Sequence, residues 1–366
     1  MAPPTRSPLL SWANVVPVVA LVVLGATWGR TPATVVVVGV ALVLAGAVLS
    51  AVHHAEVVAH RVGEPFGSLL LAVAVTIIEV ALIVTLMISG GPETATLARD
   101  TVFAAVMITC NGIVGLSLLL GARRYGLAVF NAEGSGAALA TVATVATLSL
   151  VLPTFTTSRP GPEFSGSQLA FAAVGSLVLY AAFVLTQTVR NRDFFLPVRD
   201  GDTSRAAEEH AERPTGREAG TSLVLLLIAL VAVVGLAKVE SPVIETGVAA
   251  IGFPQSFVGV VIALLVLLPE TLAAARAALR NRLQISLNLA FGSALASIGL
   301  TIPAIAIASI WLEGPLLLGL GATQMVLLAL TVVVAALTVV PGRATRLQGA
   351  VHLVLLGGFL FLAVNP

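Results

Sequence analysis

The sequence predicts an all-α polytopic membrane protein with about 11 transmembrane helices. Apolar residues make up 58% of the chain and charged residues only 10%, whereas soluble proteins average about 25% charged residues. The apolar residues form long uninterrupted runs, and one long polar connection divides these runs into two sets. We therefore expect one N-terminal helix followed by two inverted five-helix repeats.

The expected helices are apolar runs close to the roughly 20 residues that cross a bilayer. In chain order they span 11–28, 32–52, 66–88, 101–120, 137–155, 167–189, 221–239, 254–275, 286–310, 315–340 and 350–364. The first run follows Arg6, as the apolar core of a signal peptide would, but no small-x-small cleavage site follows it cleanly. We therefore interpret it as a retained membrane helix.

The long polar connection, residues 190–220, is rich in Arg, Asp, Glu, Pro and Gly and has too little apolar material to fold alone. We expect it to be a cytoplasmic linker between a first repeat, 31–189, and a second repeat, 221–366, with 1–30 as the N-terminal transmembrane helix. Five crossings in each half bring the second half into the membrane from the opposite side. The repeats are therefore predicted to be inverted.

The Lys and Arg residues of the connections predict the orientation. Fifteen of the 19 fall in connections on the side of the N-terminus, which the positive-inside rule assigns to the cytoplasm. The C-terminus is then external. The external connections also carry acidic residues, which either attract cations or are ordinary solvated side chains: Glu93, Asp100, Glu163, Glu240, Glu245 and Glu313.

Two glutamates stand alone inside long uncharged stretches. Glu79 is the only charge in residues 66–91, and Glu270 is the only charge in residues 247–274. Each falls in the second helix of its five-helix half. An ionised carboxylate at membrane depth costs at least about 3 kcal/mol and is normally kept for ions or protons. We expect both side chains to bind a transported cation or protons well below the membrane surface.

A proline next to one of these glutamates offers a further ligand. Pro269 directly precedes Glu270 and leaves the carbonyl of Leu265 without its helical partner. Such a carbonyl is a hard oxygen of the kind that calcium binds. The alternative is that Pro269 only kinks its helix, as most membrane prolines do.

Small polar residues follow each glutamate helix. Asn111 lies in the helix after Glu79, and Ser293 lies in the helix after Glu270. Both are candidate secondary ligands, and Asn111 is the better one because a buried amide needs partners. The alternative is close helix packing, since Gly292 with Ala296 and Ser293 with Ser297 form small-xxx-small pairs.

A histidine and glutamate cluster lies at the end of the second expected helix. His53, Glu56, His60 and Glu64 recur every three or four residues and share one helix face, where protons could be relayed or pH sensed. One alternative is an intramembrane metal-dependent enzyme that uses His53, His54, Glu56 and His60. The order does not match His-Glu-x-x-His, so a catalytic zinc site is poorly supported. A solvated interfacial face is the other alternative.

Three segments carry a family resemblance: His54-Ala-Glu-Val-Val-Ala-His-Arg-Val-Gly-Glu-Pro-Phe-Gly67 with the run to Ile77-Ile-Glu79, then Leu268-Pro-Glu270, then Asn288-Leu-Ala-Phe-Gly-Ser293. They resemble the bacterial ChaA-type calcium/cation–proton antiporters, which belong to the cation/calcium exchanger superfamily. The resemblance runs over most of the chain from about residue 50 onward. It implies an inner-membrane protein with one helix plus two inverted five-helix repeats, in which Glu79 and Glu270 bind calcium or protons alternately.

This resemblance and the charge of the two glutamates together predict an exchange mechanism. Two ionised glutamates in a shared cavity repel each other, and one divalent cation or two protons neutralise them equally well. The loaded protein can then switch between inward and outward access, whereas the empty form cannot. Cytoplasmic Ca²⁺, or alternatively Na⁺ or K⁺, would leave as external protons enter.

The expected partners are these ions and the lipid bilayer. We expect no cofactor beyond the transported ions and no enzymatic activity. The net charge of +1 gives no excess of positive charge for binding nucleic acid. The sequence leaves the stoichiometry and the oligomeric state open.

Overall fold

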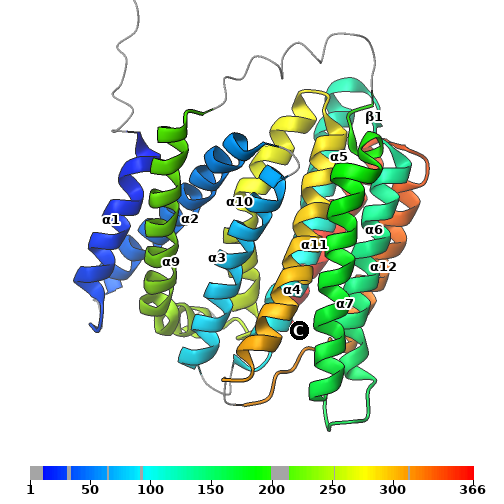
Figure 1. Ribbon diagram of the computed structural model, residues 1–366. Helices are drawn as coiled ribbons and strands as arrows, with labels where there is room; N and C mark the ends of the chain where they lie inside the picture. Colours follow the sequence, from blue (N-terminus) through cyan, green and yellow to red (C-terminus); the bar gives the residue numbers. More distant parts are fainter. Residues whose placement is uncertain are drawn as a thin grey trace, which may run out of the picture. The chain divides into compact units, whose positions relative to one another are not determined.

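The described part of the chain is mostly helical, and the predicted fold class is confirmed (Figure 1). The computed structural model describes residues 11–30, 34–63, 66–90, 94–198, 214–250, 252–311 and 314–366. Within these ranges, nine helices are long and apolar enough to cross a membrane. Two shorter apolar helices, Trp12–Thr27 and Val73–Ile88, accompany them.

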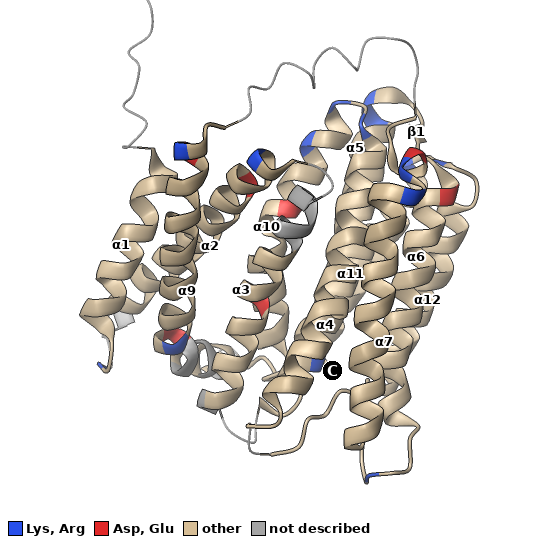
Figure 2. Ribbon diagram, in the orientation of Figure 1, with Lys and Arg blue, Asp and Glu red and all other residues tan. Residues whose placement is uncertain are grey.

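The helices follow the predicted runs in order. Their bounds are α1 Trp12–Thr27, α2 Thr34–Val62, α3 Phe66–Gly90, α4 Leu97–Met107, α5 Val114–Tyr125, α6 Ala132–Ala146, α7 Gly166–Leu185, α9 Gly216–Ala250, α10 Phe257–Leu279, α11 Leu283–Ala308, α12 Ala322–Val339 and α13 Arg346–Val364. Three π-helical segments and two 3₁₀ turns extend or join them: η3 Ile108–Ile113 between α4 and α5, η4 Thr147–Val151 and η5 Leu152–Thr154 after α6, and η6 Thr186–Arg190 and η7 Arg192–Phe195 after α7. Figure 2 shows that the charged residues gather near helix ends and leave long uncharged stretches between them.

The predicted linker is partly helical. Helix α9 begins at Gly216, inside the range 190–220, because Thr215 and Glu218 cap it. The Thr215 backbone N–H donates to Glu218 Oε2 over 2.7 Å, and the Glu218 N–H donates to Thr215 Oγ1 over 3.3 Å. These reciprocal bonds satisfy backbone donors that a helix start leaves open. Residues 199–213 of the linker lie outside the described residues.

One predicted helix begins later than expected. The apolar run 315–340 is helical only from Ala322, and the residues before it form an extended segment. Its backbone bonds to a turn before α4 and to η4: Leu317 N–H donates to Ala95 O over 3.1 Å, and Leu320 N–H donates to Leu150 O over 2.7 Å. Gly319 is essential to this course, because a Cβ there would collide with Thr154 and would stand 2.6 Å from Pro162 Cβ. Apolar composition alone does not reveal such a segment, since its backbone partners are distant in sequence.

The chain folds into two compact units, each of which takes segments from both halves of the sequence. The first unit contains Met1–Gly90 and Glu209–Gly247, and the second contains Gly91–Glu208 and Val248–Pro366. Helices α1, α2, α3 and most of α9 belong to the first unit. The predicted domain boundaries at 31–189, 190–220 and 221–366 stay a prediction.

In the first unit, two polar side chains fasten α2 to α1. Ser50 Oγ donates to Ala13 O over 2.7 Å, and His54 Nε2 lies 2.9 Å from the same carbonyl oxygen. Helix α9 approaches α1 at Gly235, where a Cβ would stand 2.5 Å from a methyl carbon of Leu24. His54 is therefore a packing residue of this unit.

The second unit contains two matching helix pairs. Helix α13 packs along α5, and α7 packs along α11. Each pair has a glycine at its point of closest approach: a Cβ on Gly115 would stand 2.8 Å from His352 Cβ, and a Cβ on Gly299 would stand 2.7 Å from Tyr180 Cβ. Any side chain at either glycine would force the two helices apart.

The connections of the second unit also match. The strand before α6, β1 (Ala128–Val129), pairs antiparallel with the strand before α13, β2 (Arg343–Ala344). In the corresponding arrangement, the segment before α12 pairs with the segment before α7 through an antiparallel bridge between Leu317 and Glu163. The fourth helix of each half is thus tied to the fifth helix of the other, which is the pattern expected of two inverted repeats.

Candidate functional site

Glu79 lies near the middle of α3 and is 4% exposed. It is the only charged residue of this helix. Thr76, one turn earlier, is also buried, and Ile78 and Ile83 are fully buried beside it. The helix forms here because its residues are almost all apolar, and the carboxylate is carried into the interior with them. A carboxylate held in such a setting favours ion or proton binding.

Glu270 lies in the second half of α10 and is half-buried. Helix α10 continues through Pro269, and Leu265, whose carbonyl the proline leaves without its helical partner, is also half-buried. One residue after Glu270, Thr271 Oγ1 donates to Leu267 O over 2.7 Å. This bond goes to the carbonyl two residues after that of Leu265, from which Pro269 removes the backbone donor.

The two glutamates belong to different units, Glu79 to the first and Glu270 to the second. Each is placed as predicted within its own helix. Their pairing around one ion stays a prediction, as does the role of the Leu265 carbonyl.

Asn111 lies in η3, which is buried along its whole length. Its amide Nδ2 donates to Thr331 Oγ1 of α12 over 2.9 Å, and its Oδ1 lies 3.1 Å from Nδ1 of His352 in α13. The amide thus finds partners, as a buried amide must. These partners are two neighbouring helices of the second unit. π-Helical turns are rare in proteins, but those that occur are often found at functional sites. The segment η3 therefore stays a candidate part of the site.

Ser293 lies half-buried on α11, a helix that packs against both α10 and η3. The helices that carry Glu270, Asn111 and Ser293 therefore contact one another within the second unit. Close packing at Gly292 is not observed among the described residues, because a Cβ added there would meet none of their atoms within 4 Å. The expectation that this glycine serves a small-xxx-small contact is wrong at this position.

Asn288, which was part of the family resemblance, has a structural partner. Its Nδ2 donates to Phe195 O of η7 over 2.7 Å, and its Oδ1 accepts from Gln284 Nε2 over 2.9 Å. Gln284 Oε1 in turn accepts from the backbone N–H of Asn131, the first residue before α6, over 2.7 Å. This chain of bonds holds the start of α11 against two connections of the first half.

The histidine and glutamate cluster lies on α2. His53, Glu56 and His60 are all exposed on this helix, as the predicted common face requires, and Glu64 lies outside the described residues. His54 is buried and 1% exposed, and its ring bonds to α1 instead of joining that face. In the part of the chain that the structure describes, no three His, Cys, Asp or Glu residues are placed to hold a metal ion together. Of the residues named for a metal-dependent enzyme, His54 is thus turned toward α1 and away from the face of the other three.

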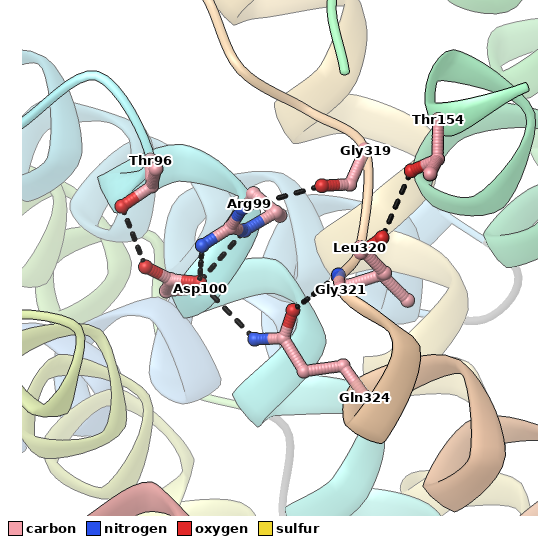
Figure 3. A network of polar contacts seen from close by, with 8 residues as sticks. All are labelled: Thr96, Arg99, Asp100, Thr154, Gly319, Leu320, Gly321 and Gln324. Atoms are coloured by element: carbon pink, nitrogen blue, oxygen red, sulfur yellow. Dashed lines mark hydrogen bonds and ion pairs between the residues drawn. The ribbon is translucent and has the colours of Figure 1, made fainter. Parts of the chain in front are cut away.

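A polar network that sequence reasoning missed lies at the start of α4 (Figure 3). Asp100 is 4% exposed and forms an ion pair with Arg99, whose Nη2 lies 2.8 Å from Asp100 Oδ1. Asp100 also accepts from Thr96 Oγ1 over 2.8 Å and from Gln324 Nε2 of α12 over 3.3 Å. Asp100 was expected to be one of the acids of a loop, and that expectation is wrong.

The same network fixes the extended segment before α12. Arg99 Nη1 donates to Gly319 O over 3.2 Å, and Thr154 Oγ1 donates to Leu320 O over 2.8 Å (Figure 3). The sequence carried one signal for this network: Arg99 and Asp100 form an adjacent pair of opposite charges directly before an apolar run.

Comparison with known proteins identifies the family. The family described as sodium/calcium exchanger protein matches residues 32–189 and again residues 221–365. The chain belongs to this sodium/calcium exchanger family. It is similar to y4hA of Sinorhizobium fredii, with 46% identity over 98% of this chain and 97% of that protein. It is also 36% identical to the sodium-potassium/proton antiporter ChaA of Escherichia coli, over 94% of this chain and 93% of ChaA.

A more distant relative and two solved structures extend the comparison. A Ca²⁺/H⁺ antiporter of Aphanothece halophytica is 25% identical over 85% of this chain and 86% of its own length. The solved structure of native YfkE matches with a TM-score of 0.72 at 16% identity, over 97% of this chain and 99% of that one. The H⁺/Ca²⁺ exchanger CAX matches with the same TM-score of 0.72 over 95% of this chain and 86% of that one. These two structures show that the exchanger fold is shared.

Proposed function

We propose that this protein is a secondary transporter that exchanges a cytoplasmic cation, Ca²⁺, for external protons at a site formed by Glu79 and Glu270. The observation that carries the proposal is the presence of one carboxylate in the second helix of each half, with Glu79 buried and Glu270 half-buried in otherwise apolar helices. Membership of the exchanger family supports the same function, since two of the relatives are named as antiporters that use protons.

The mechanism follows from charge balance. Two carboxylates in a cavity of low dielectric are costly to keep ionised together, and one divalent cation or two protons cancel their charge. The protein switches between inward and outward access when the charge of the two carboxylates is cancelled. It does not switch when that charge is present. Asn111, Ser293 and the carbonyl of Leu265 are proposed as neutral oxygen ligands that complete the shell of a calcium ion, which takes six to eight oxygens.

Sodium or potassium is the second candidate cargo. The relative at 36% identity is named for sodium and potassium, whereas the calcium antiporter is only 25% identical. A monovalent ion leaves one carboxylate charge uncancelled, so a proton would have to remain on the other carboxylate for the same switching rule to hold. The two cargoes therefore differ in how many protons each transported ion displaces.

The test is reconstitution in liposomes under an imposed pH difference, with Ca²⁺, Na⁺, K⁺ and Mg²⁺ compared. We expect saturable uptake of Ca²⁺ against its gradient, and little uptake of Mg²⁺ because that ion gives up its water reluctantly. Uptake of Na⁺ or K⁺ in place of Ca²⁺ would select the second cargo. Flux that neither saturates nor responds to the pH difference would indicate a passive channel and overturn the proposal.

A further inference from the structure

A pocket lies at the end of the second unit where α5 and α10 end and α11 begins. It is lined by Tyr125 at the end of α5, by Leu127 and Val129, by Pro197 and Val198, and by the turn from α10 into α11. Its volume is about 290 Å³. One water molecule takes about 30 Å³ in the liquid, so the pocket is large enough for a phosphate group. None of its lining residues is a proposed ion ligand.

Hydrogen bonds hold the walls of this pocket in place. The Tyr125 hydroxyl donates to Leu279 O over 2.9 Å and thereby fixes the end of α5 to the end of α10. Gln284 Oε1 accepts from the Asn131 N–H over 2.7 Å and fixes the start of α11 to the chain after β1. The bond from α11 to Phe195 O holds η7, which leads into the third wall. The shape of the pocket is therefore set by contacts within the protein.

Three arginines lie beside the pocket. The guanidinium carbon of Arg124 lies 5.8 Å from the centre of the Tyr125 ring. Arg343 is the cross-strand partner of Val129 in the β1–β2 pair, so the two side chains lie on the same face of that pair. Arg280 follows the last residue of α10, at the turn into α11. All three are exposed, and none of them forms an ion pair with a described residue.

The charges at this end of the second unit are mostly positive. Figure 2 shows blue residues gathered around α5 and β1. The described basic residues at this end are Arg123, Arg124, Arg190, Arg192, Arg276, Arg280, Arg282, Arg343 and Arg346, and the described acids there are Glu133 and Asp193. Such an excess of positive charge attracts anions. Because the guanidinium group matches phosphate oxygens with two parallel hydrogen bonds, the pocket is suited to a phosphate group.

The pocket also lies at the level expected for the surface of the bilayer. Two candidate membrane spans end beside it and a third begins there: Leu97–Tyr125, Phe257–Leu279 and Leu283–Ala308. Leu127, Val129 and Val198 line the pocket and are nearly half exposed. A free phosphate ion gains nothing from apolar neighbours, whereas a phospholipid carries a phosphate next to hydrocarbon. Basic pockets between transmembrane helices on the cytoplasmic side are known to bind anionic headgroups.

We propose that this pocket binds the headgroup of an anionic phospholipid from the leaflet that is predicted to be cytoplasmic. Arg124, Arg280 and Arg343 contact its phosphate, and its apolar part lies beside Leu127 and Val129. The site does not depend on which ion the protein transports. A lipid bound there joins the end of α5, the β1–β2 pair and the turn between α10 and α11, and so stabilises the second unit.

The first experiment compares two lipids that differ in headgroup charge. Full-length protein in detergent is titrated with phosphatidylglycerol and, separately, with phosphatidylcholine, and bound lipid is counted by native mass spectrometry. We expect phosphatidylglycerol to bind at least about tenfold more tightly, because it alone brings a net negative charge to the arginines. Thermal unfolding in the same detergent should show the matching stabilisation, weaker at high salt. Equal affinities for the two lipids would overturn the proposal.

The second experiment removes charge beside the pocket. In the double variant Arg124→Gln/Arg343→Gln we expect the affinity for phosphatidylglycerol to fall at least about tenfold, since one arginine near an anionic lipid contributes about fivefold. The matched control is Arg61→Gln/Arg217→Gln, which removes the same charge from exposed positions of the first unit and should keep the wild-type affinity. Equal losses in the two double variants would show attraction without a site and contradict the proposal.

The third experiment fills the pocket and leaves every arginine in place. Val129→Trp adds a large side chain at an exposed lining position, and the affinity for phosphatidylglycerol should fall toward that for phosphatidylcholine. An unchanged affinity would place the lipid elsewhere on the arginine-rich surface.

Inorganic phosphate, compared with chloride at the same ionic strength, separates the two sources of a phosphate group. We expect it to raise the unfolding temperature of the wild-type protein less than phosphatidylglycerol does. An equal rise would assign the pocket to soluble phosphate and rule out the lipid. All these measurements follow binding and stability, so their outcome is independent of whether the proposed cation–proton exchange is observed.

Discussion

Glu79 and Glu270 differ in their surroundings. Glu79 is 4% exposed on a helix that is otherwise uncharged, whereas Glu270 is half-buried beside a proline that weakens the backbone hydrogen bonding of its helix. In the proposed ion site, one carboxylate would then be enclosed, and the other would lie next to the carbonyl that Pro269 leaves without its helical partner. The exchange proposal requires both.

Glu79→Gln and Glu270→Gln each remove one of the two charges that must be cancelled. We therefore expect pH-driven Ca²⁺ uptake into liposomes by either variant to fall to the level of protein-free liposomes. Glu133→Gln, an exposed acid in the first turn of α6, is the matched control and should keep wild-type uptake. Substantial uptake in either glutamate variant would remove the proposed site.

Asp100 shows a different use of a buried acid. Asp100→Asn takes away the charge partner of Arg99, whose side chain is only 15% exposed, and leaves a poorly solvated cation. We expect the free energy of unfolding in detergent to fall by about 3 kcal/mol. Glu163→Gln breaks the Arg159–Glu163 pair, in which Arg159 is 54% exposed, and should cost no more than about 1 kcal/mol. Equal losses in the two variants would mean that the Asp100 network does not stabilise the fold.

At the scale of the elements, the position of α10 depends on one glycine. A Cβ on Gly259 would stand 2.7 Å from the backbone nitrogen of Thr101, so α10 and α4 approach each other here without room for any side chain. Asp100 and its network occupy the α4 side of this contact. The helix that carries Glu270 is thereby held to the helix that leads into η3.

Gly259 and Gly292 differ in the space around them. We expect Gly259→Ala to lower the free energy of unfolding by about 1–3 kcal/mol, because backbone atoms must move to admit the methyl group. Gly292→Ala should be neutral or stabilising by up to about 1 kcal/mol, since nothing lies within 4 Å and alanine favours a helix. Thermal unfolding of both variants in the same detergent measures the difference, and a neutral Gly259→Ala would refute the assignment of this contact.

At the scale of the whole molecule, the positive-inside rule predicts a cytoplasmic N-terminus, a cytoplasmic start of α9 and an external α6–α7 connection. Ser158→Cys and Glu218→Cys place a thiol at exposed positions in these two regions. The native Cys110 is 1% exposed and should give little background labelling.

The expected result is that a membrane-impermeant maleimide labels Ser158→Cys in intact cells and labels Glu218→Cys only after the cells are opened. The excess of arginine in the connection before α9 should keep the start of this helix in the cytoplasm. The reverse labelling pattern would invert the predicted orientation and with it the proposed direction of exchange.

The fold class, the order of the helices and the two lone glutamates follow from the amino-acid sequence alone. The length and apolar character of a segment determine whether it can cross a bilayer. An isolated acid in such a segment costs too much free energy to be incidental. These properties are local along the chain, so they can be read without knowing what packs against what.

Which polar groups meet depends on how the helices pack against one another. His352 looks isolated along the chain, yet its ring lies 3.1 Å from Asn111, a residue of the other half. Asp100 was expected in a loop and is buried against Gln324. In both cases the partners are more than two hundred residues apart, and their contact depends on the interlocking of two inverted halves, for which no local pattern of residues exists.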